Sequence, residues 1–374
     1  MKKIEFNEEF FFVHPHGLYL EGAQMALPGL RFIVDRPGLN STAALLQDAR
    51  TQAELPAGAR LLLMKPAPKI EFLAREHGWR LVSVSSELNR RFENKLTIGT
   101  GFAQANLPSL QFEVSRPKDL SWEDVLERLG TKLVVQTERG HAGSGSYLID
   151  SEDEWKRLVV GQGDYETKLM PFVEGETWTL NACVTHYGTL VSRPFLQLQN
   201  LPWCGADNPL TTCGNWHKEI EDGLAFEIMK HAERFGDEMH RASYRGWFGL
   251  DVLVQGEEIK GFIECNPRLT ASTGIFTRLQ VEAGQTPLLT LHVLELLGCD
   301  YELDLLLEQE KLNQGFEEYH IVLRNGSAEP IVCPEPEPQA GVEMISRKPG
   351  TPIPPGEPYA LAVAKQPFSL SPTH

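Results

Sequence analysis

Cysteine is scarce in this chain and is not arranged for chemistry. No two cysteines form a Cys-x-x-Cys pair. They are scattered over positions 183, 204, 213, 265, 299 and 333. Zinc sites and disulfide frameworks are recognised by closely or regularly spaced cysteines, so the sequence indicates neither. We therefore expect a protein of the reducing cytoplasm.

Long apolar runs are also missing. No run reaches the roughly 18 residues that a membrane-spanning helix needs. Lysines follow Met1 as they do in signal peptides, but Glu5, Glu8 and Glu9 stand where the apolar part of a signal peptide would have to be. We expect no membrane contact.

Positive charge is in short supply. Lysine and arginine number 35 against 51 aspartates and glutamates, which gives a net charge of −16. Nucleic acids and anionic membrane surfaces are bound through positive patches, so we expect neither as a partner. A phosphate-bearing ligand would depend on the few lysines and arginines placed near it.

What is present is the pattern of an α/β protein with room for two or three domains in 374 residues. Residues 10–13, 61–64 and 81–84 are short apolar runs typical of buried strands, and residues 70–77 suit a helix that Gly78 ends. This strand and helix order predicts a parallel sheet. We interpret the histidines at 14 and 16, which follow the first strand, as loop residues rather than ligands.

A predicted β-hairpin carries the most informative residues. Residues 248–265 contain two runs rich in Val, Ile, Leu and Phe on either side of a Gly-Glu-Glu turn at 256–258. A turn centred on the two glutamates puts Asp251 directly opposite Glu264, with Asn266 on the same face. Opposed carboxylates repel, and a cation between them removes the repulsion. Such oxygen ligands suit Mg²⁺ shared with phosphate, and the alternative is a solvated acidic face.

Asp251, followed by Glu264-x-Asn266-Pro267-Arg268, resembles the metal-binding end of the ATP-grasp fold. The resemblance implies that Asp251, Glu264 and Asn266 hold two Mg²⁺ ions against the phosphates of ATP. It also implies that Arg268 grips the carboxylate substrate or its acyl phosphate. Cys265 should then point to the core side of its strand as a buried, inert thiol.

A glycine-rich segment, Gly140-x-x-Gly143-Ser144-Gly145-Ser146, lies between predicted strands at 132–136 and 147–149. Small residues let backbone N–H groups close over phosphate oxygens, although such loops are also common as simple turns. The segment is neither a Walker A loop nor a dinucleotide fingerprint. ATP-grasp proteins carry a glycine loop at about this distance before the acidic residue, so the resemblance implies that residues 143–146 cover the ATP phosphates as a lid.

Two further segments match the same family in order. Asn94-Lys95 resembles an Asp-Lys element whose lysine reaches the nucleotide phosphates. The run that begins at Met170 resembles the hinge between subdomains, where backbone groups near Phe172 would meet the adenine edge and Glu174 the ribose hydroxyls.

The resemblance covers roughly residues 90–300, and it implies an α/β (α+β) protein with an ATP-grasp fold. The expected divisions are an N-terminal parallel α/β domain, an ATP-grasp domain with a small lid subdomain inside it, and a small C-terminal β-rich domain, at residues 1–90, 91–311 (lid at about 110–173) and 312–374.

Two positions depart from the family. Gln136 ends its strand where most relatives place a lysine that contacts the α- and β-phosphates, and glutamine brings no charge. Lys132 and Arg139 are the candidates to replace that charge. Pro171 stands where many relatives carry a glutamate that accepts from the adenine amino group. These departures keep open a nucleotide-binding protein with altered activity.

The implied function is that of an ATP-dependent ligase that joins a small-molecule carboxylate to an amine through an acyl phosphate, on amino-acid-like substrates. An enzyme of the same fold that activates bicarbonate is one alternative, and a non-catalytic nucleotide sensor is the other. A homodimer is left open. We expect substrate specificity in the segment 186–217, or else a surface excursion with its own core; its distinctive side chains are Trp203, Cys204, Asn208, Trp216 and His217.

Overall fold

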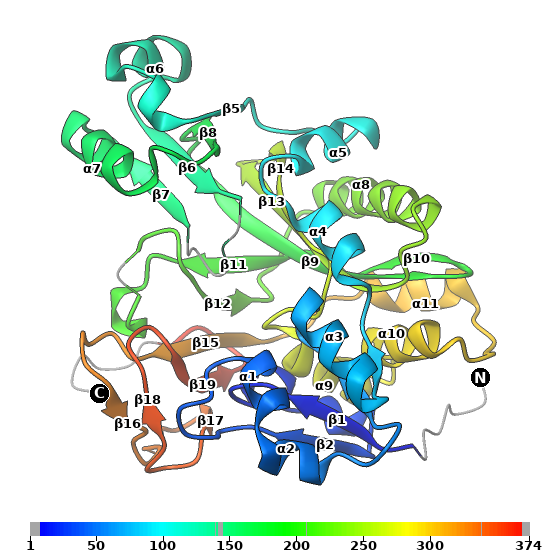
Figure 1. Ribbon diagram of the computed structural model, residues 1–374. Helices are drawn as coiled ribbons and strands as arrows, with labels where there is room; N and C mark the ends of the chain where they lie inside the picture. Colours follow the sequence, from blue (N-terminus) through cyan, green and yellow to red (C-terminus); the bar gives the residue numbers. More distant parts are fainter. Residues whose placement is uncertain (1–7, 139, 141–144, 207, 338, 369–374) are drawn as a thin grey trace.

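The computed structural model describes residues 8–138, 140, 145–206, 208–337 and 339–368. Figure 1 shows the N-terminal parallel sheet at the bottom, a small antiparallel sheet at the top, and a large antiparallel sheet between them.

The parallel sheet confirms the predicted α/β arrangement of the N-terminal segment. Its order is β2–β1–β3–β4, and each neighbouring pair is parallel, with bounds Phe10–Val13 (β1), Leu30–Ile33 (β2), Arg60–Leu62 (β3) and Arg80–Val82 (β4). The helix that precedes β4 ends at Gly78, whose φ of 68° suits glycine. The helices in this part of the chain are α1 (Thr42–Gln47), α2 (Ala49–Glu54), α3 (Pro68–His77), α4 (Ser86–Glu93) and α5 (Ile98–Gln104).

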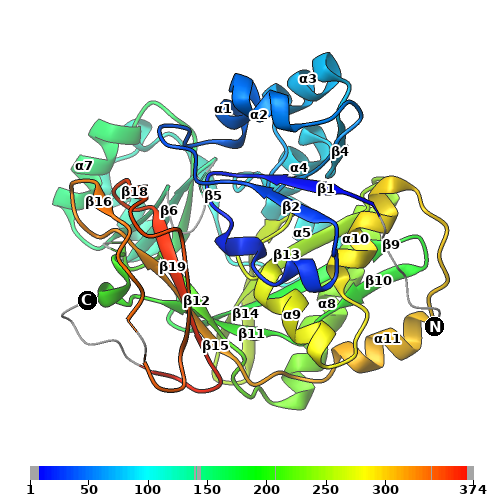
Figure 2. The same ribbon diagram turned by 90° about the horizontal axis from the view of Figure 1, so that it is seen from below.

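Helices cover both faces of this sheet (Figure 2). Phe11 and Val13 pack with α1 and α3 on one face, whereas Phe10 and Phe12 point to the other. That second face packs against α9 (Thr273–Glu282) and α10 (Leu288–Leu297), which come from much later in the chain. α10 is capped by Gly298, and the next helix, α11, covers Leu305–Leu312.

The large sheet is antiparallel throughout, in the order β14–β13–β9–β11–β12–β15–β19–β17, with β10 paired to β9. Its strands are β9 (Glu176–Thr185), β10 (Gly188–Val191), β11 (Phe195–Gln199), β12 (Thr212–Trp216), β13 (Gly246–Gln255), β14 (Glu258–Asn266), β15 (Tyr319–Arg324), β17 (Glu343–Ser346) and β19 (Pro358–Ala364).

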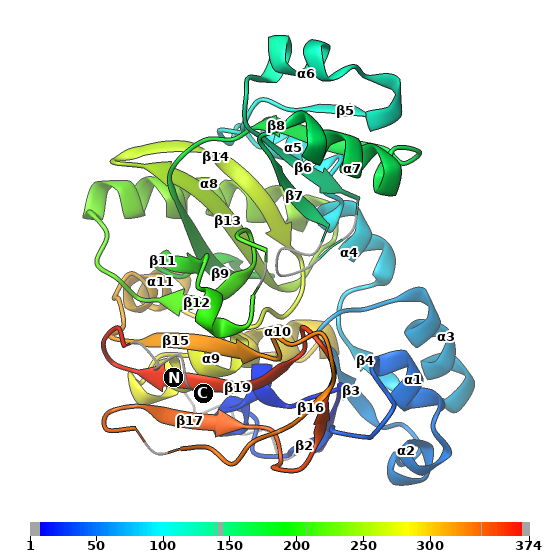
Figure 3. The same ribbon diagram turned by 90° about the vertical axis from the view of Figure 1, so that its left-hand side faces the viewer.

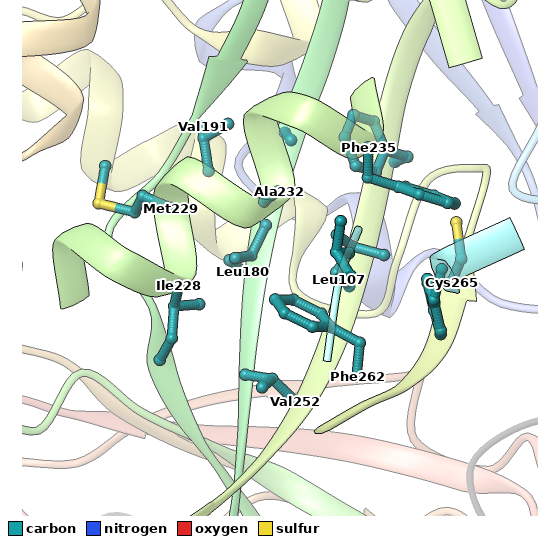
Figure 4. Close-up of a cluster of buried hydrophobic side chains, with 14 of the residues drawn as sticks. Leu107, Leu180, Val191, Ile228, Met229, Ala232, Phe235, Val252, Phe262 and Cys265 are labelled. Carbon is teal, nitrogen blue, oxygen red and sulfur yellow. The ribbon is translucent and has the colours of Figure 1, made fainter. Parts of the chain in front are cut away.

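One face of this sheet is buried by α8 (Asp222–Arg241), as Figure 4 shows. Leu180 and Val252 lie under the helix, and Phe262 fills the space beside them. Cys265 belongs to the same cluster and is 1% exposed, which confirms that its thiol faces the core.

The β13–β14 hairpin differs from its predicted register and yet delivers the predicted pair. Gln255 pairs with Glu258, so the turn falls on Gly256 and Glu257 rather than on the two glutamates. Two register shifts along the hairpin correct the offset, and Asp251 lies opposite Glu264 as predicted.

The small sheet has the order β5–β8–β6–β7, all antiparallel, with bounds Glu113–Ser115 (β5), Thr167–Pro171 (β8), Leu133–Thr137 (β6) and Ser146–Ile149 (β7). Val135 and Leu169 point to one face, where α6 (Trp122–Leu129) and α7 (Glu152–Gln162) cover them. The opposite face looks toward the large sheet.

The C-terminal segment continues the large sheet rather than folding on its own. β15 pairs with β12, and β19 pairs with β15 (Figure 3). A separate ribbon joins β16 (Ile331–Val332) to β18 (Pro352–Ile353). In the described ranges, no helix is long and apolar enough to cross a membrane.

Candidate nucleotide-binding site

A cavity of about 580 Å³ lies where the small sheet faces the large one. Its walls come from β6, β7 and β8 of the small sheet, from β9, β12, β13, β14 and β15 of the large sheet, and from the segment 268–272. Ligand sites commonly have volumes of roughly 300–1,000 Å³. Lys95, Gln136, Ser146, Met170, Phe172, Asp251, Glu264, Asn266 and Arg268 all line it.

The carboxylate pair lies inside this cavity. Asp251 is 8% exposed, faces Glu264 across the hairpin, and receives a long contact of 3.4 Å from the Asn266 amide. On its other side Asp251 pairs with Thr179 of β9, whose side chain hydrogen-bonds to it. Burial, with the nearby Glu264 charge second, raises the pKa of Asp251 to about 7.

Lys95 supplies the opposing charge. Its Nζ lies 3.0 Å from Glu264 Oε2, and its side chain is almost entirely buried. The resemblance to ATP-grasp proteins implied that Lys95 reaches the nucleotide phosphates. In the fold, Lys95 contacts Glu264, the carboxylate that the same resemblance assigned to the metal. Glu264 therefore has a cation beside it.

The metal assignment rests on oxygen ligands alone. Within the described residues, no group of three or more His, Cys, Asp or Glu side chains is placed to hold a metal ion. Asp251, Glu264 and Asn266 provide two carboxylates and one amide, which are ligands that fit Mg²⁺ when phosphate oxygens complete the shell. The donor set thus fits a cation that binds together with a nucleotide.

Gln136 is buried at the phosphate end of β6. Its Nε2 donates to Ser146 Oγ at 3.2 Å, and its Oε1 has no hydrogen-bond partner among the described residues. Lys132 does not take its place, because the Lys132 Nζ lies 4.0 Å above the Phe172 ring at the other end of the strand. Arg139, the other candidate, lies outside the described residues.

A second buried lysine stands directly beside Gln136. Lys168 pairs with Gln136 across β6 and β8, so both side chains leave the sheet on the same face. Gln136 lines the cavity, and Lys168 lies behind it rather than among the lining residues. Lys168 is 3% exposed and has no ion-pair partner among the residues that the structure describes. Burial lowers the pKa of Lys168 to about 8, and the opposing charges of Glu264 and Lys95 act on it as well.

The glycine loop is described only where it meets β7. Gly143 and Ser144 lie outside the described residues. Gly145 has a φ of 73° and accepts from the backbone N–H of Thr137 at 2.8 Å. The carbonyl of Ser146 accepts from Asn208 at 2.9 Å, which ties the base of the loop to the segment after β11.

The predicted hinge reaches the cavity, but not with every residue assigned to it. Met170 and Phe172 line the wall, whereas Glu174 is exposed and is not among the lining residues. The N–H of Phe172 already donates to the Lys132 carbonyl at 2.8 Å, so this donor is used within the protein. Next to the hinge, a Cβ at Gly175 would lie 2.5 Å from the Val254 carbonyl oxygen, which only glycine permits.

Arg268 lines the cavity and is held by its neighbours. Its Nε donates to Glu93 at 2.8 Å, and its two other nitrogens donate to Asn266 Oδ1 and to the Leu269 carbonyl, at 2.9 and 3.2 Å. Burial alone would raise the pKa of Glu93, but Arg268 and Lys65 outweigh that effect and hold it below its usual range. The Arg268 guanidinium thus orients Asn266, and its carboxylate partner is Glu93 of the protein itself.

Comparison with known proteins shows likeness in structure rather than in sequence. No family model matches the chain, and no curated protein matches it in sequence. N5-carboxyaminoimidazole ribonucleotide synthetase from Thermus thermophilus matches over 96% of this chain and 93% of that chain, with TM-score 0.64 and 17% identity. The Campylobacter jejuni biotin carboxylase, solved as a β,γ-ATP complex, matches over 95% and 86%, with TM-score 0.70 and 10% identity.

A third similar structure is the biotin carboxylase domain of 2-oxoglutarate carboxylase from Hydrogenobacter thermophilus. It matches over 95% of this chain and 85% of that chain, with TM-score 0.67 and 13% identity. These matches run almost the full length of the chain. The chain has the ATP-grasp fold.

Within this ATP-grasp fold, sequence reasoning missed several cavity residues. Arg324, at the end of β15, lines the cavity; its guanidinium has no ion pair or hydrogen bond to the described residues, and its Nε is buried. On β9, Thr177 and Thr179 face the cavity, and Asn181 follows at the same spacing. The alternation of these polar residues with Trp178 and Leu180 was a signal visible in the sequence.

The segment 186–217 contributes to the ATP-grasp cavity through other residues than those predicted. Its lining residues are Gln197, Gln199, Asn200, Pro209, Leu210, Thr212, Gly214 and Asn215. Trp203, Cys204 and Trp216 instead pack in a small core with Tyr319, and His217 stacks on Phe195. The segment therefore lines the cavity and also has a small core of its own. Its role in substrate specificity stays a prediction.

Proposed function

We propose that this protein is an ATP-dependent carboxylate–amine ligase, which phosphorylates a small carboxylate and lets an amine attack the acyl phosphate. The observation that carries this proposal is the buried pair Asp251 and Glu264 in a cavity that also holds Lys95. Asp251 is raised in pKa and Glu264 is paired with a lysine, an arrangement that suits a divalent cation and phosphate oxygens. Stabilising the charge that develops on a transferred phosphoryl group is the main task of such a site.

Cationic side chains support the phosphate half of the proposal. Lys95 and Lys168 are both buried near Glu264, and Lys168 has no carboxylate partner among the described residues. The Lys168 Nζ lies 5.1 Å from the centre of the Phe112 ring. A buried ammonium without a carboxylate partner is still costly, and an anionic ligand would offset that cost. We propose that Lys168 supplies the charge that Gln136 lacks.

Arg324 supports the carboxylate half. Its guanidinium is without a partner in the described structure, whereas Arg268 is engaged by Glu93 and Asn266. A planar guanidinium binds a carboxylate or a phosphate through two parallel hydrogen bonds. We therefore assign the substrate grip to Arg324 and a positioning role to Arg268.

Bicarbonate activation is the second candidate, and the comparisons favour it specifically. The Hydrogenobacter domain was solved with MgADP and bicarbonate. Bicarbonate presents the same oxygen pair to an arginine as a carboxylate does. Both reactions begin with the same phosphorylation, so the first step does not separate them.

ADP release separates these functions. The protein would be incubated with MgATP and either the pooled amino acids or bicarbonate with a pool of amines. We expect ADP release that depends on the amino acids, and Glu264→Ala should abolish it while the circular dichroism spectrum stays unchanged. Glu258→Ala, an exposed change on the same strand, is the matched control and should behave as wild type.

Release with bicarbonate but not with amino acids would favour the second candidate. ATP binding by calorimetry without ADP release in either mixture would instead identify a nucleotide sensor. Undiminished release by Glu264→Ala would remove the metal assignment.

A further inference from the structure

A buried chain of polar residues enters the cavity from the side opposite the carboxylate pair. Glu318, just before β15, accepts from His320 Nδ1 through its Oε1, with a distance of 2.6 Å. His320 Nε2 lies 3.3 Å from the side-chain amide of Asn215 on β12. His217 Nε2 lies 3.4 Å from the other oxygen of Glu318, without forming a hydrogen bond to it.

The strand register aims this chain at the cavity. His320 pairs with Asn215 across β12 and β15, so both side chains project from one face. His320, Val322 and Arg324 line the cavity, whereas Ile321 and Leu323 pack into the core behind it. The strands approach closely because residue 214 is glycine: a Cβ there would lie 2.0 Å from the His320 carbonyl oxygen.

Burial makes a purely structural interpretation costly. Glu318, His320 and His217 have at most 7% of their side chains exposed. Burial lowers the pKa of His217 to about 4, with a smaller contribution from His320, so His217 is neutral near pH 7 and cannot neutralise Glu318. The Glu318 carboxylate therefore acts on the ring of His320.

The hydrogen bonds also determine which ring nitrogen is available. Nδ1 carries the proton that Glu318 accepts, so Nε2 is the basic nitrogen of neutral His320 and accepts from Asn215. When Nε2 becomes protonated, Asn215 can present its carbonyl oxygen instead. His320 lines the ligand cavity, its Nδ1 is held by a carboxylate, and its Nε2 contacts a neutral amide. This is the arrangement of a general base.

We propose that His320 is the general base that deprotonates the attacking amine, with Glu318 as its positioning residue. This inference rests on the proposed function. In the step, the amine nitrogen forms a bond to the acyl carbon, the carbon–oxygen bond to phosphate breaks, and inorganic phosphate leaves. Before the attack, the substrate ammonium gives one proton to His320 Nε2, which passes it to solvent, so that the nitrogen has a free electron pair. After the bond to the acyl carbon forms, the nitrogen loses its second proton to the departing phosphate or to solvent, which leaves the neutral amide. The nucleophile is therefore an amine that is protonated at neutral pH, such as a primary alkyl amine or an amino acid.

Hydroxylamine separates this role from the earlier phosphorylation. It is unprotonated at neutral pH and attacks acyl phosphates without a base, whereas primary amines are ammonium ions. The wild-type protein would be supplied with MgATP and the twenty amino acids, with and without hydroxylamine, and hydroxamate and amide products would be measured. No hydroxamate from the wild type would refute the proposed function itself, before the role of His320 is considered.

If the wild type forms hydroxamate, we expect the rate of hydroxamate formation by His320→Gln to stay within about twofold of the wild-type rate. Its rate of amide formation should fall by at least about 100-fold at pH 7, which is the contribution typical of a general base. Amide formation should recover in part at high pH, where the amine loses its proton unaided. Glu318→Gln should show the same pattern more weakly. His231→Gln, in α8 outside the cavity, is the control.

Equal losses of hydroxamate and amide in His320→Gln would overturn the proposal, and so would unchanged amide formation. His320→Asn covers the case in which His320→Gln fails to fold. It should also lose amide formation while hydroxamate formation stays near normal, and equal losses of both products in it would overturn the role as well.

Discussion

Asp251→Asn should make the metal-free protein more stable and remove its response to Mg²⁺ and nucleotide. Asp251 is buried opposite Glu264, and the pKa of its carboxyl rises from 3.8 to about 7. The folded state therefore holds a proton that the unfolded state releases between these two values. Stability falls as pH rises through this window, and the loss is complete above about pH 7.

The magnitude follows from the two pKa values. At about 1.4 kcal/mol for each pKa unit, the rise from 3.8 to about 7 corresponds to about 4 kcal/mol at pH 8. At pH 5 Asp251 is still protonated in the folded state, and only the interval from 3.8 to 5 counts, which corresponds to about 1.7 kcal/mol. An asparagine carries no charge at either pH. The free energy of unfolding of the variant should therefore exceed that of the wild type by about 4 kcal/mol at pH 8 and by about 1.7 kcal/mol at pH 5.

Urea unfolding with a chelator, at both pH values, measures these differences. Glu257→Gln, an exposed change in the turn of the same hairpin, should stay within about 0.5 kcal/mol of the wild type. Adding MgCl₂ and ATP should stabilise the wild type and not Asp251→Asn. If the variant is no more stable than the wild type at pH 8 with chelator present, the two carboxylates do not repel and the electrostatic argument for a metal fails.

Three further changes test individual side chains. Gln136→Lys puts two lysines opposite each other, because residue 136 pairs with Lys168, and like charges repel there. Without nucleotide, thermal shift should therefore show a lower melting temperature than that of the wild type. MgATP should raise the melting temperature of the variant by more than that of the wild type, and equal rises would contradict this. Arg268→Lys loses its contacts with Asn266 and a backbone carbonyl, at about 1 kcal/mol each, so urea unfolding should show a loss of about 2 kcal/mol with or without ligand. Normal stability with a large rise in KM for the carboxylate would instead make Arg268 the substrate grip. Arg324→Gln should leave ATP affinity by calorimetry near normal and raise the carboxylate concentration for half-maximal ADP release at least tenfold; an unchanged requirement would remove Arg324 from the site.

The sequence predicted the carboxylate pair because a hairpin register is short-range. Asp251 and Glu264 are separated by one turn, and their alternation with apolar residues decides which face they occupy. The turn itself was predicted one residue too late, and two register shifts compensate for the error. The residue types of the hairpin do not predict these register shifts, because a β-bulge depends on how both strands pack.

Contacts between segments that are distant in the sequence could not be predicted from it. Lys168 lies beside Gln136 because β6 pairs with β8, and α7 lies between these two strands in the sequence. Arg324 reaches the cavity because β15 pairs with β12, which begins more than 100 residues earlier in the sequence. The strand predicted at 132–136 is β6, one residue later. Lys132 lies just before it, and the Lys132 ammonium lies over the Phe172 ring of the hinge. The alternation of polar and apolar residues along a strand predicts which face of the sheet each side chain occupies. Which strand lies next to it is determined by the tertiary fold.

The position of β15 within the large sheet has a consequence for synthesis of the protein. One wall of the cavity, including His320 and Arg324, is made from a strand that leaves the ribosome after almost all of the other walls. Until then β12 has an open edge, and β19 arrives later still to cover β15. Nascent chains that end before residue 324 therefore have the Asp251–Glu264 pair but an incomplete cavity, so a ligand that needs the β15 wall cannot assist folding until that strand has been made.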